Sequence, residues 1–370
     1  MAAVQYHHGK FPPEELNYET LLPLIGPAHT AIGTYSGLLN AIPNTRVLLS
    51  PLSTQEAVLS SKIEGTQTTM SEVLEFEAVE EAASESRRDD FQEVLNYRRA
   101  MIHAVQLMND IPLSQRLLRG AHEVLMQGAR GQNKAPGQYR KQPNWIGLQG
   151  QPVELARFVP PDAQQIPELM SSWERYLHSQ TPDALIQLAV LHAEFESIHP
   201  FYDGNGRLGR LLVPLLLVDK KILNSPDFYI SAYLEAHCDE YYDRLLAVSR
   251  DDDWTGWCAF FLKALHAQAK DNCSKAKSIL TLYEMKKHEI MEQTRSKYAL
   301  LATDWFFNYP VFKSSAFIHK AGIPESTATR ILREVRDHGL LQEVHPAGGR
   351  KSAVLVFSDL LNIAEGRHSP

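Results

Sequence analysis

The chain has 370 residues, of which 44% are hydrophobic and 22% charged, and a net charge of −7, the profile of a soluble globular protein with room for two or three domains. Its three cysteines, Cys238, Cys258 and Cys273, are odd in number and widely spaced, which argues against a disulfide framework or a cysteine-based zinc site. The first residues lack the basic and apolar regions of a signal peptide, and the longest apolar run, at 211–218, is too short to span a bilayer, so we expect a cytoplasmic protein with no membrane partner.

Helical patterns dominate the N-terminal third of the chain. In the stretch SPLSTQEAVLSSKIEGTQ, Ser53 and Glu56 form a capping box, and Gly65 is suited to end the helix. These signals predict a short helix at about 53–65. The acidic run at 72–90 is typical of a solvated helix end followed by a linker.

The middle of the chain alternates between helices and one irregular segment. Residues 91–130 predict two amphipathic helices. Between 130 and 155, Pro, Gly, Tyr, Trp and Ile follow one another at short distances, which predicts a small hairpin or flap. Residues 182–198 have a helical pattern that leads directly to His199. A second, very apolar stretch follows at 206–223. It contains Pro214 and predicts a kinked helix at the centre of a bundle.

The last seventy-odd residues have the pattern of a separate module. From Arg295 onward there are ten Lys and Arg against seven Asp and Glu, so this end is mildly basic. The order of helix, short turn, helix and hairpin resembles a winged helix-turn-helix domain, which binds DNA through its second helix. A net charge of +3 is weak for DNA binding, so dimerisation or target docking stays open. The second helix would cover 326–339, and its candidate DNA contacts are Arg330, Arg333 and Arg336.

One segment, HPFYDGNGRLGR at 199–210, holds residues that an ordinary loop does not need. Gly204 and Gly206 permit backbone conformations in which successive N–H groups converge on an anion. The helix that begins here adds the positive end of its dipole. Arg207 and Arg210 are spaced i and i+3, so they are neighbours on one helix face and suit phosphates. The combination predicts a polyphosphate site.

Two further residues complete the chemistry of this segment. Asp203 would repel phosphate unless it binds a hard cation, so we expect Mg²⁺ to bridge carboxylate and phosphate. His199, at the end of the preceding helix, is suited to act as a general base near neutral pH. The segment therefore predicts phosphoryl or nucleotidyl transfer to a hydroxyl.

The same segment resembles the signature of Fic-domain proteins, His-x-Phe-x-(Asp/Glu)-Gly-Asn-Gly-Arg-x-x-Arg, at every constrained position. The resemblance implies transfer of AMP from ATP to a Ser, Thr or Tyr hydroxyl of a target protein, with release of pyrophosphate. It implies that His199 is the base and that Asp203 holds Mg²⁺. The β and γ phosphates would bind Arg207 and Arg210, and the anion hole would be Gly204 to Gly206. The nucleotide-binding residues implied here are Gly204, Asn205, Gly206, Arg207, Leu208, Gly209 and Arg210.

The predicted helix at about 53–65 also resembles a Fic element. Ser60, Glu64 and Gly65 match the inhibitory motif (Ser/Thr)-x-x-x-Glu-(Gly/Asn), and Ser60 and Glu64 share a helix face. The resemblance implies that Glu64 pairs with Arg210 and prevents productive seating of the γ-phosphate. Because the motif precedes the catalytic core, it implies an inhibitory helix at the N-terminal side of the same chain.

Two other segments are similar to Fic elements. The flap at 137–149 resembles the hairpin that holds a target protein by strand addition. Tyr241 matches a Fic position that stacks on adenine, with a core position as the equal alternative. The same alternative stays open for Ile146. The flap residues that would lie near the nucleotide are Ile146, Gly147, Leu148 and Gln149.

We therefore expect a mostly α fold, with a Fic helical bundle, a small β-hairpin flap and a C-terminal winged helix-turn-helix domain. The expected parts are an N-terminal helical region at 1–100, a catalytic core at 101–285 and the winged helix at 286–370. The expected activity is that of an autoinhibited protein adenylyltransferase that uses ATP and Mg²⁺. A DNA-binding regulator with a nucleotide-sensing core and an enzyme that removes AMP stay open as alternatives, as do self-modification and homodimerisation.

Overall fold

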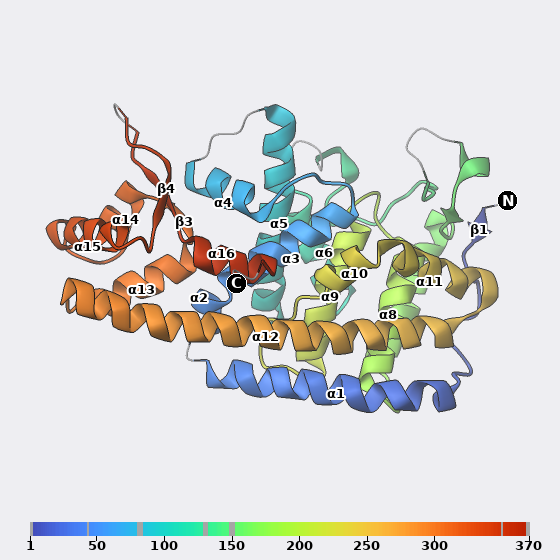
Figure 1. Ribbon diagram of the computed structural model, residues 1–370. Coiled ribbons are helices and arrows are strands. Elements are labelled where there is room, and N and C mark those ends of the chain that lie inside the picture. The colour runs from blue at the N-terminus through green and yellow to red at the C-terminus, as the bar shows by residue number, and fades with distance from the viewer. Residues whose placement is uncertain are drawn as a thin grey trace. The chain divides into compact units, whose positions relative to one another are not determined.

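The computed structural model of the protein describes residues 3–42, 44–79, 84–128, 132–147, 152–348 and 351–367. It is mostly helical, as the sequence predicts, with a few short strands (Figure 1). The chain divides into two compact units. The first contains residues 1–36, 59–66 and 95–270, and the second contains residues 37–58, 67–94 and 271–370. The domain boundaries expected after residues 100 and 285 remain predictions.

The first unit is built around two successive helices, α8 (Ala184–Ile198) and α9 (Asn205–Asp219), which pack against each other. Nearly all their residues are buried, because both sequences are apolar on every side and such helices need cover all round. In the described part of the chain no helix, α9 included, is long and apolar enough to cross a membrane. Other helices of this unit are α6 (Gln115–Leu125), α7 (Ile166–Leu177), α10 (Ser231–Ala236) and α11 (Cys238–Asp251).

Some helices contribute residues to both units: α1 (Tyr18–Ala41), α3 (Ser50–Ile63), α5 (Glu85–Met108) and the long α12 (Trp254–Thr294), orange in Figure 1. The start of α3 differs from the prediction, because the helix begins at Ser50 and Ser53 lies inside it. Its end agrees with the prediction. Gly65 has φ +98°, a conformation that glycine adopts at little cost and other residues avoid.

The flap region of the first unit contains very short strands. β1 (Val4–Gln5) pairs in parallel with β2 (Phe158–Val159). Ile146 forms one antiparallel bridge with Phe158, and its N–H donates to the Phe158 carbonyl at 2.9 Å. In the described residues the predicted hairpin is thus a single bridge. Pro143 and Pro152 lie on its two arms and cannot donate hydrogen bonds to a longer ladder. Short 3₁₀ turns lie at Gln132–Lys134, Val153–Leu155 and Ala163–Gln165.

The second unit contains a helix–turn–helix followed by two strands and one further helix. α14 (Ser314–Lys320) and α15 (Glu325–Asp337) precede β4 (Gln342–His345) and β5 (Val354–Val356), and β5 lies between β4 and β3 (Val311–Lys313) in an antiparallel sheet. This is the predicted order of elements; the winged-helix assignment stays a prediction. The acidic run at 72–90, expected as a solvated helix end followed by a linker, carries most of α4 (Met70–Val79) and the start of α5. The remaining helices are α2 (Thr45–Leu48), α13 (Ala299–Asn308) and α16 (Ser358–Glu365).

Candidate active site

The predicted base, His199, directly follows α8 and caps its C-terminal end. Its backbone is left-handed, with φ 49° and ψ 60°, and its N–H donates to the Phe195 carbonyl at 3.1 Å. That conformation costs a non-glycine residue roughly 1 kcal/mol, so surrounding contacts must hold it. Nδ1 lies 3.4 Å from the Glu196 carbonyl, which can only accept, so Nδ1 carries the proton and Nε2 keeps a lone pair. Burial lowers the pKa of His199 to about 4, so the ring is neutral at pH 7 and able to accept a proton.

The side chain of Asn205 closes the loop that follows His199. Its Oδ1 accepts from the N–H of Phe201 and its Nδ2 donates to the carbonyl of Phe201, both at 2.9 Å. Phe201 is fully buried and stacks on His122, with 3.8 Å between the ring centres. His122 in turn binds the Asp203 carbonyl through Nε2 at 2.9 Å. The side chain of Asn205 thus holds the loop in shape. An anion at this helix end could bind only the backbone N–H of Asn205.

The N-terminal end of α9 is suited to bind an anion. Gly204 is the N-cap with φ 78°, and no side chain caps the helix there. The N–H groups of the first turn and the positive end of the helix dipole suit an anionic ligand there. A Cβ at position 204 would lie 2.7 Å from Sδ of Met126, and a Cβ at position 206 would overlap the carboxylate of Glu64. The left-handed backbone therefore favours glycine at position 204, and a side chain at position 206 would displace the Glu64 carboxylate.

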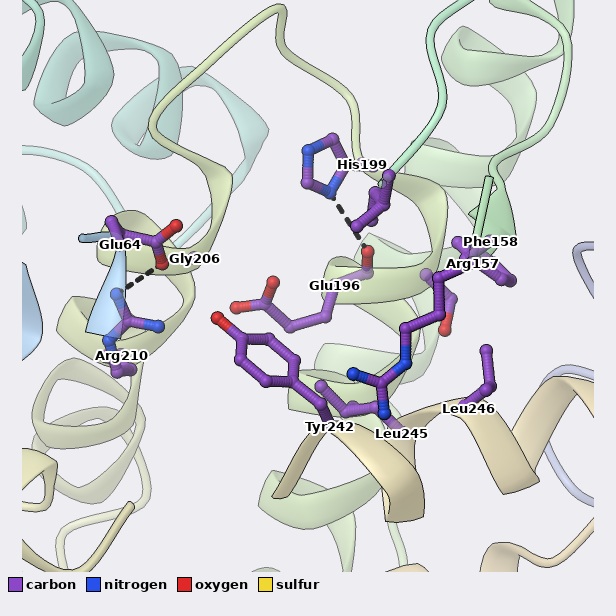
Figure 2. Close-up of a pocket in the computed structure, with 12 residues that line it drawn as sticks. Glu64, Arg157, Phe158, Glu196, His199, Gly206, Arg210, Tyr242, Leu245 and Leu246 are labelled. Atoms are coloured by element: carbon purple, nitrogen blue, oxygen red, sulfur yellow. Dashed lines mark hydrogen bonds and ion pairs between the residues drawn. The ribbon is translucent and has the colours of Figure 1, made fainter. Parts of the chain in front are cut away.

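Arg210 is fully buried and is bonded to the C-terminal end of α3. Its Nε donates to the Ser60 hydroxyl at 2.9 Å, and its Nη2 donates to the Ser60 carbonyl at 2.8 Å and to the Glu64 carboxylate at 2.6 Å. Gly65 follows directly and turns the chain away. The structure therefore brings Ser60 and Glu64 of the predicted inhibitory motif to an arginine 150 residues after Ser60. Figure 2 shows the contact between Glu64 and Arg210.

The charges of Glu64 and Arg210 stabilise each other. Burial by itself would raise the pKa of Glu64, but the guanidinium groups of Arg210 and Arg207 overcome this effect and hold that pKa below its ordinary value. Burial likewise opposes the charge of Arg210, yet the Glu64 carboxylate raises the pKa of Arg210. Both groups are therefore charged at neutral pH. The negative charge of Glu64 lies beside Gly206, at the end of α9 where a phosphate was predicted.

Asp203 and Arg207 lie at the same end of α9. Oδ1 of Asp203 accepts from the Gly204 N–H at 2.6 Å and lies 3.6 Å from Nη2 of Arg207. The Asp203 side chain is 46% exposed, whereas Arg207 is buried. Among the described residues, no group of three or more His, Cys, Asp or Glu could hold a metal by itself. One exposed carboxylate nevertheless suits Mg²⁺, which takes most of its ligands from phosphates and water.

A cavity of about 120 Å³ lies at the N-terminal end of α9, next to the Glu64–Arg210 pair (Figure 2). His199, Glu64, Gly206 and Arg210 all line it, so the predicted base and the predicted inhibitory pair face one space. Ile146 also lines it, as predicted for the flap. Sequence reasoning missed the remaining lining residues, which are Arg157, Phe158, Glu196, Ser197, Tyr242, Leu245 and Leu246.

Tyr242, and not Tyr241, faces this cavity. Tyr241 is 1% exposed, and its hydroxyl binds Nε2 of His192 at 2.9 Å. The rings of Trp257 and Phe260 surround it. The structure therefore places Tyr241 in the core, the alternative that the sequence left open. Successive residues on a helix point about 100° apart, so the next tyrosine reaches a different surface. The sequence signal that could have found Tyr242 is its place directly after Tyr241, since two adjacent tyrosines on one helix face different surroundings.

Other predicted nucleotide-binding positions do not line the cavity. Leu208 is fully buried in the core of the first unit. A Cβ at Gly209 would overlap the carboxylate of Glu196, so this glycine serves a close side-chain contact. Gly147 packs against the backbone just before β2. Leu148 and Gln149 lie outside the described residues.

Glu196 is an unusual acid for a cavity wall. Its Oε1 is buried and makes no hydrogen bond within the described structure, and burial raises its pKa to about 8. Nε2 of His192 lies 3.9 Å away but accepts from Tyr241, and burial lowers the pKa of His192 to about 3. His192 therefore carries no charge that would ionise Glu196. The carboxyl is mostly neutral at pH 7 and able to both donate and accept a hydrogen bond.

Two family models match the chain. The Fic/DOC family N-terminal model covers residues 22–106, and the Fic/DOC family model covers residues 112–217, which include the whole segment from His199 to Arg210. A solved Fic family protein from Desulfovibrio desulfuricans G20 is similar in fold, with a TM-score of 0.60 and 21% identity over 94% of this chain and 98% of that chain. A Fic domain containing signaling protein from Bacteroides thetaiotaomicron VPI-5482 gives a TM-score of 0.55 and 16% identity over 69% of this chain and 97% of that one.

Curated relatives match shorter stretches. A probable protein adenylyltransferase from Aquifex aeolicus (strain VF5) is 40% identical over 86 residues, which are 22% of this chain and 27% of that protein. The protein adenylyltransferase Fic of Drosophila yakuba is 41% identical over 69 residues, which are 18% of this chain and 14% of that protein. The matches thus span about a quarter of the first relative and a smaller part of the second. From the two family models, the shared fold and the complete motif at His199–Arg210, we conclude that the chain belongs to the Fic/DOC family.

Proposed function

We propose that this chain is a protein adenylyltransferase, which moves AMP from ATP to a Ser, Thr or Tyr hydroxyl of a target protein, and that Glu64 holds it inactive. The adenylyltransferase names of partial relatives support the reaction class. The observation that carries the proposal is the single cavity that joins a neutral His199 to the Glu64–Arg210 pair at the N-terminal end of α9.

The chemistry follows from the positions of these groups. Nε2 of His199 takes the proton of the target hydroxyl, whose oxygen attacks the α-phosphorus of ATP. The bond between the α-phosphorus and the bridging oxygen breaks, and pyrophosphate leaves with the electron pair. The N–H groups of the first turn of α9, together with Arg207 and Arg210, stabilise the negative charge on the phosphates.

Asp203 is the residue that would hold Mg²⁺, because its carboxylate is partly exposed at the same helix end. The metal would neutralise charge on the phosphates when it is bound with the nucleotide. The Gly204 N–H holds one carboxylate oxygen in place at 2.6 Å. This contact orients Asp203 before a ligand arrives.

The proposed inhibition is a competition for Arg210. Glu64 and Ser60 together accept three hydrogen bonds from its guanidinium. A phosphate that approached Arg210 would meet the Glu64 carboxylate beside Gly206. The two negative groups would be neighbours there and would repel each other. A truncated side chain at position 64 would remove the competing carboxylate from Arg210 and open the helix end, while the two bonds from Arg210 to Ser60 would still hold the guanidinium in place.

The test compares the unaltered protein with Glu64→Gly, His199→Ala and the double variant Glu64→Gly/His199→Ala, each with Mg²⁺, cell lysate and ATP labelled on the α-phosphate. We expect strong protein labelling, self-labelling included, with Glu64→Gly alone. Labelling by Glu64→Gly/His199→Ala equal to that of Glu64→Gly would overturn the base assignment. Label transferred from γ-labelled ATP would mean phosphate transfer instead.

Removal of AMP is a second candidate, because Glu64 and His199 line the same cavity and could both act on water there. The Glu64→Gly enzyme supplies AMP-modified protein for this test. Release of AMP from that product by the unaltered protein, and not by its His199→Ala variant, would favour this reaction. Absence of release would leave transfer as the proposed direction.

For the C-terminal module, we propose target docking ahead of DNA binding. Arg330 donates to Glu334 at 3.0 Å, and Arg336 forms an ion pair with Glu343, so two of the three candidate arginines are already engaged with carboxylates. Arg333 is exposed. Titration of the full chain with labelled duplex DNA at 50 and 200 mM salt tests this choice, and tight, salt-sensitive binding would reverse it.

A further inference from the structure

Arg140 is a buried arginine in the flap segment, with 2% of its surface exposed. In the described structure all three nitrogens of its planar guanidinium donate hydrogen bonds to backbone carbonyls. Nε donates to His199 at 3.0 Å, Nη1 to Gln142 at 3.2 Å, and Nη2 to Pro161 at 2.5 Å and Ile198 at 3.5 Å. Its own N–H donates to the carbonyl of Pro200 at 2.9 Å.

Three of these bonds, to the carbonyls of Ile198, His199 and Pro200, fall at or just after the C-terminal end of α8, where carbonyls lack partners within the helix. The end of a helix carries partial negative charge, and a nearby cation stabilises it. Burial lowers the pKa of Arg140, but a guanidinium still keeps its charge at pH 7. The side chain therefore places a fixed positive charge and several donors on the peptide groups before and after His199.

We propose that Arg140 is the positioning residue for His199, and that it holds the base in its left-handed backbone conformation and so directs the ring toward the cavity. This inference rests on the proposed role of His199 as a base. It also gives the flap a direct mechanical connection to the base, because Arg140 and the cavity-lining Ile146 belong to one short segment. A target protein that binds the flap would act on the same segment.

Arg140 also belongs to the set of charges that surround the His199 ring. Burial lowers the pKa of His199, Glu64 and Asp203 raise it, and Arg140 lowers it. The Glu196 carbonyl at Nδ1 favours the protonated ring. A substitution that removes the charge of Arg140 should therefore raise the pKa of His199, whereas a purely structural arginine elsewhere in the flap region should not change it.

The experiment compares Arg140→Gln and Arg140→Lys with Arg119→Gln as the matched control. Arg119 also donates to a backbone carbonyl of the flap segment, that of Gly137 at 2.7 Å. The His199 titration is followed by NMR of ¹³C-labelled histidine rings, with the signal assigned by its loss in His199→Ala. Kinetics are measured in the Glu64→Gly background, where we expect activity.

We expect Arg140→Gln to raise the pKa of His199 and to lower kcat about 100-fold, because an error of about 1 Å in a reacting group costs that much, while KM for ATP stays within a few-fold. Arg140→Lys should keep the pKa low, since it keeps the charge, yet lower kcat about 10-fold, since an ammonium lacks the planar fork. Arg119→Gln should change neither quantity.

The assignment is overturned if Arg140→Gln melts like the unaltered protein and leaves both the His199 titration and kcat unchanged. If Arg140→Gln does not fold, Arg140→Lys decides: unchanged kcat, or failure to fold as well, leaves Arg140 a merely structural residue. The NMR arm does not need an active enzyme. A shifted titration without any AMP transfer would therefore retain the positioning role and reject the proposed function.

Discussion

The carboxylate of Glu64 accepts a 2.6 Å hydrogen bond from Arg210 and occupies the space that a Cβ at residue 206 would need. The pair therefore depends on the missing side chain of Gly206 as much as on opposite charge. Gly206, which the sequence assigns to phosphate binding, therefore also leaves room for the Glu64 carboxylate, which would repel a phosphate.

Gly206→Ala should destabilise the protein by about 1–3 kcal/mol, because the added methyl group overlaps the Glu64 carboxylate and crowds Nη1 of Arg210 at 3.0 Å. Urea unfolding at pH 7 measures the loss. The same substitution in the Glu64→Gly background should cost clearly less, since the main obstacle has gone. Equal losses in the two backgrounds would show that the methyl group meets something other than Glu64.

Glu64→Gln should lower the free energy of unfolding at pH 7 by about 1 kcal/mol, a modest value because the Glu64 side chain is 35% exposed. The folded-state pKa of Glu64 lies below its ordinary value of 4.5, because Arg210 outweighs burial. The ionic stabilisation is therefore present above pH 4.5 and is lost as the pH falls through the folded-state pKa. Urea unfolding of both forms at several pH values should give a constant difference from pH 7 to 5.5 and a smaller one near pH 4. A difference that widens with acid would contradict the pairing.

Much of the site could be predicted because its residues are adjacent in the sequence. The segment from His199 to Arg210 carries its own spacing, and the i, i+4 relation of Ser60 and Glu64 placed them on one face. Tyr242 and Glu196 could not be found in this way. Their roles depend on which face of a helix is covered by other segments, and local periodicity alone does not decide between two adjacent tyrosines. The start of α3 was missed because tertiary packing extends a helix past a local cap signal.

His122 should make the folded state sensitive to acid. Burial lowers its folded-state pKa to about 4 from an ordinary 6.5, so the unfolded chain takes up the proton first. The stability that this neutral ring contributes is present above pH 6.5 and is lost as the pH falls toward 4, by up to about 1.4 kcal/mol per pH unit. Unfolding measured between pH 7 and 4.5 should thus show a shallower fall for His122→Gln than for the unaltered protein. The exposed His288→Gln variant is the control and should keep the original slope.

Substitutions of Tyr241 and Tyr242 should have different effects, one on stability and the other on nucleotide binding. Tyr241→Phe removes the hydroxyl that binds His192 at 2.9 Å inside the core, so it should cost about 1 kcal/mol of stability and leave nucleotide affinity unchanged. Tyr242→Ala removes a ring from the cavity wall, so it should weaken ATP binding about 10-fold in the Glu64→Gly background, with a smaller effect on unfolding than truncation of a fully buried ring. Urea unfolding and isothermal titration calorimetry measure the two quantities on the same samples. If Tyr241→Phe reduced ATP affinity while Tyr242→Ala did not, the cavity lined by Tyr242 would not be the nucleotide site.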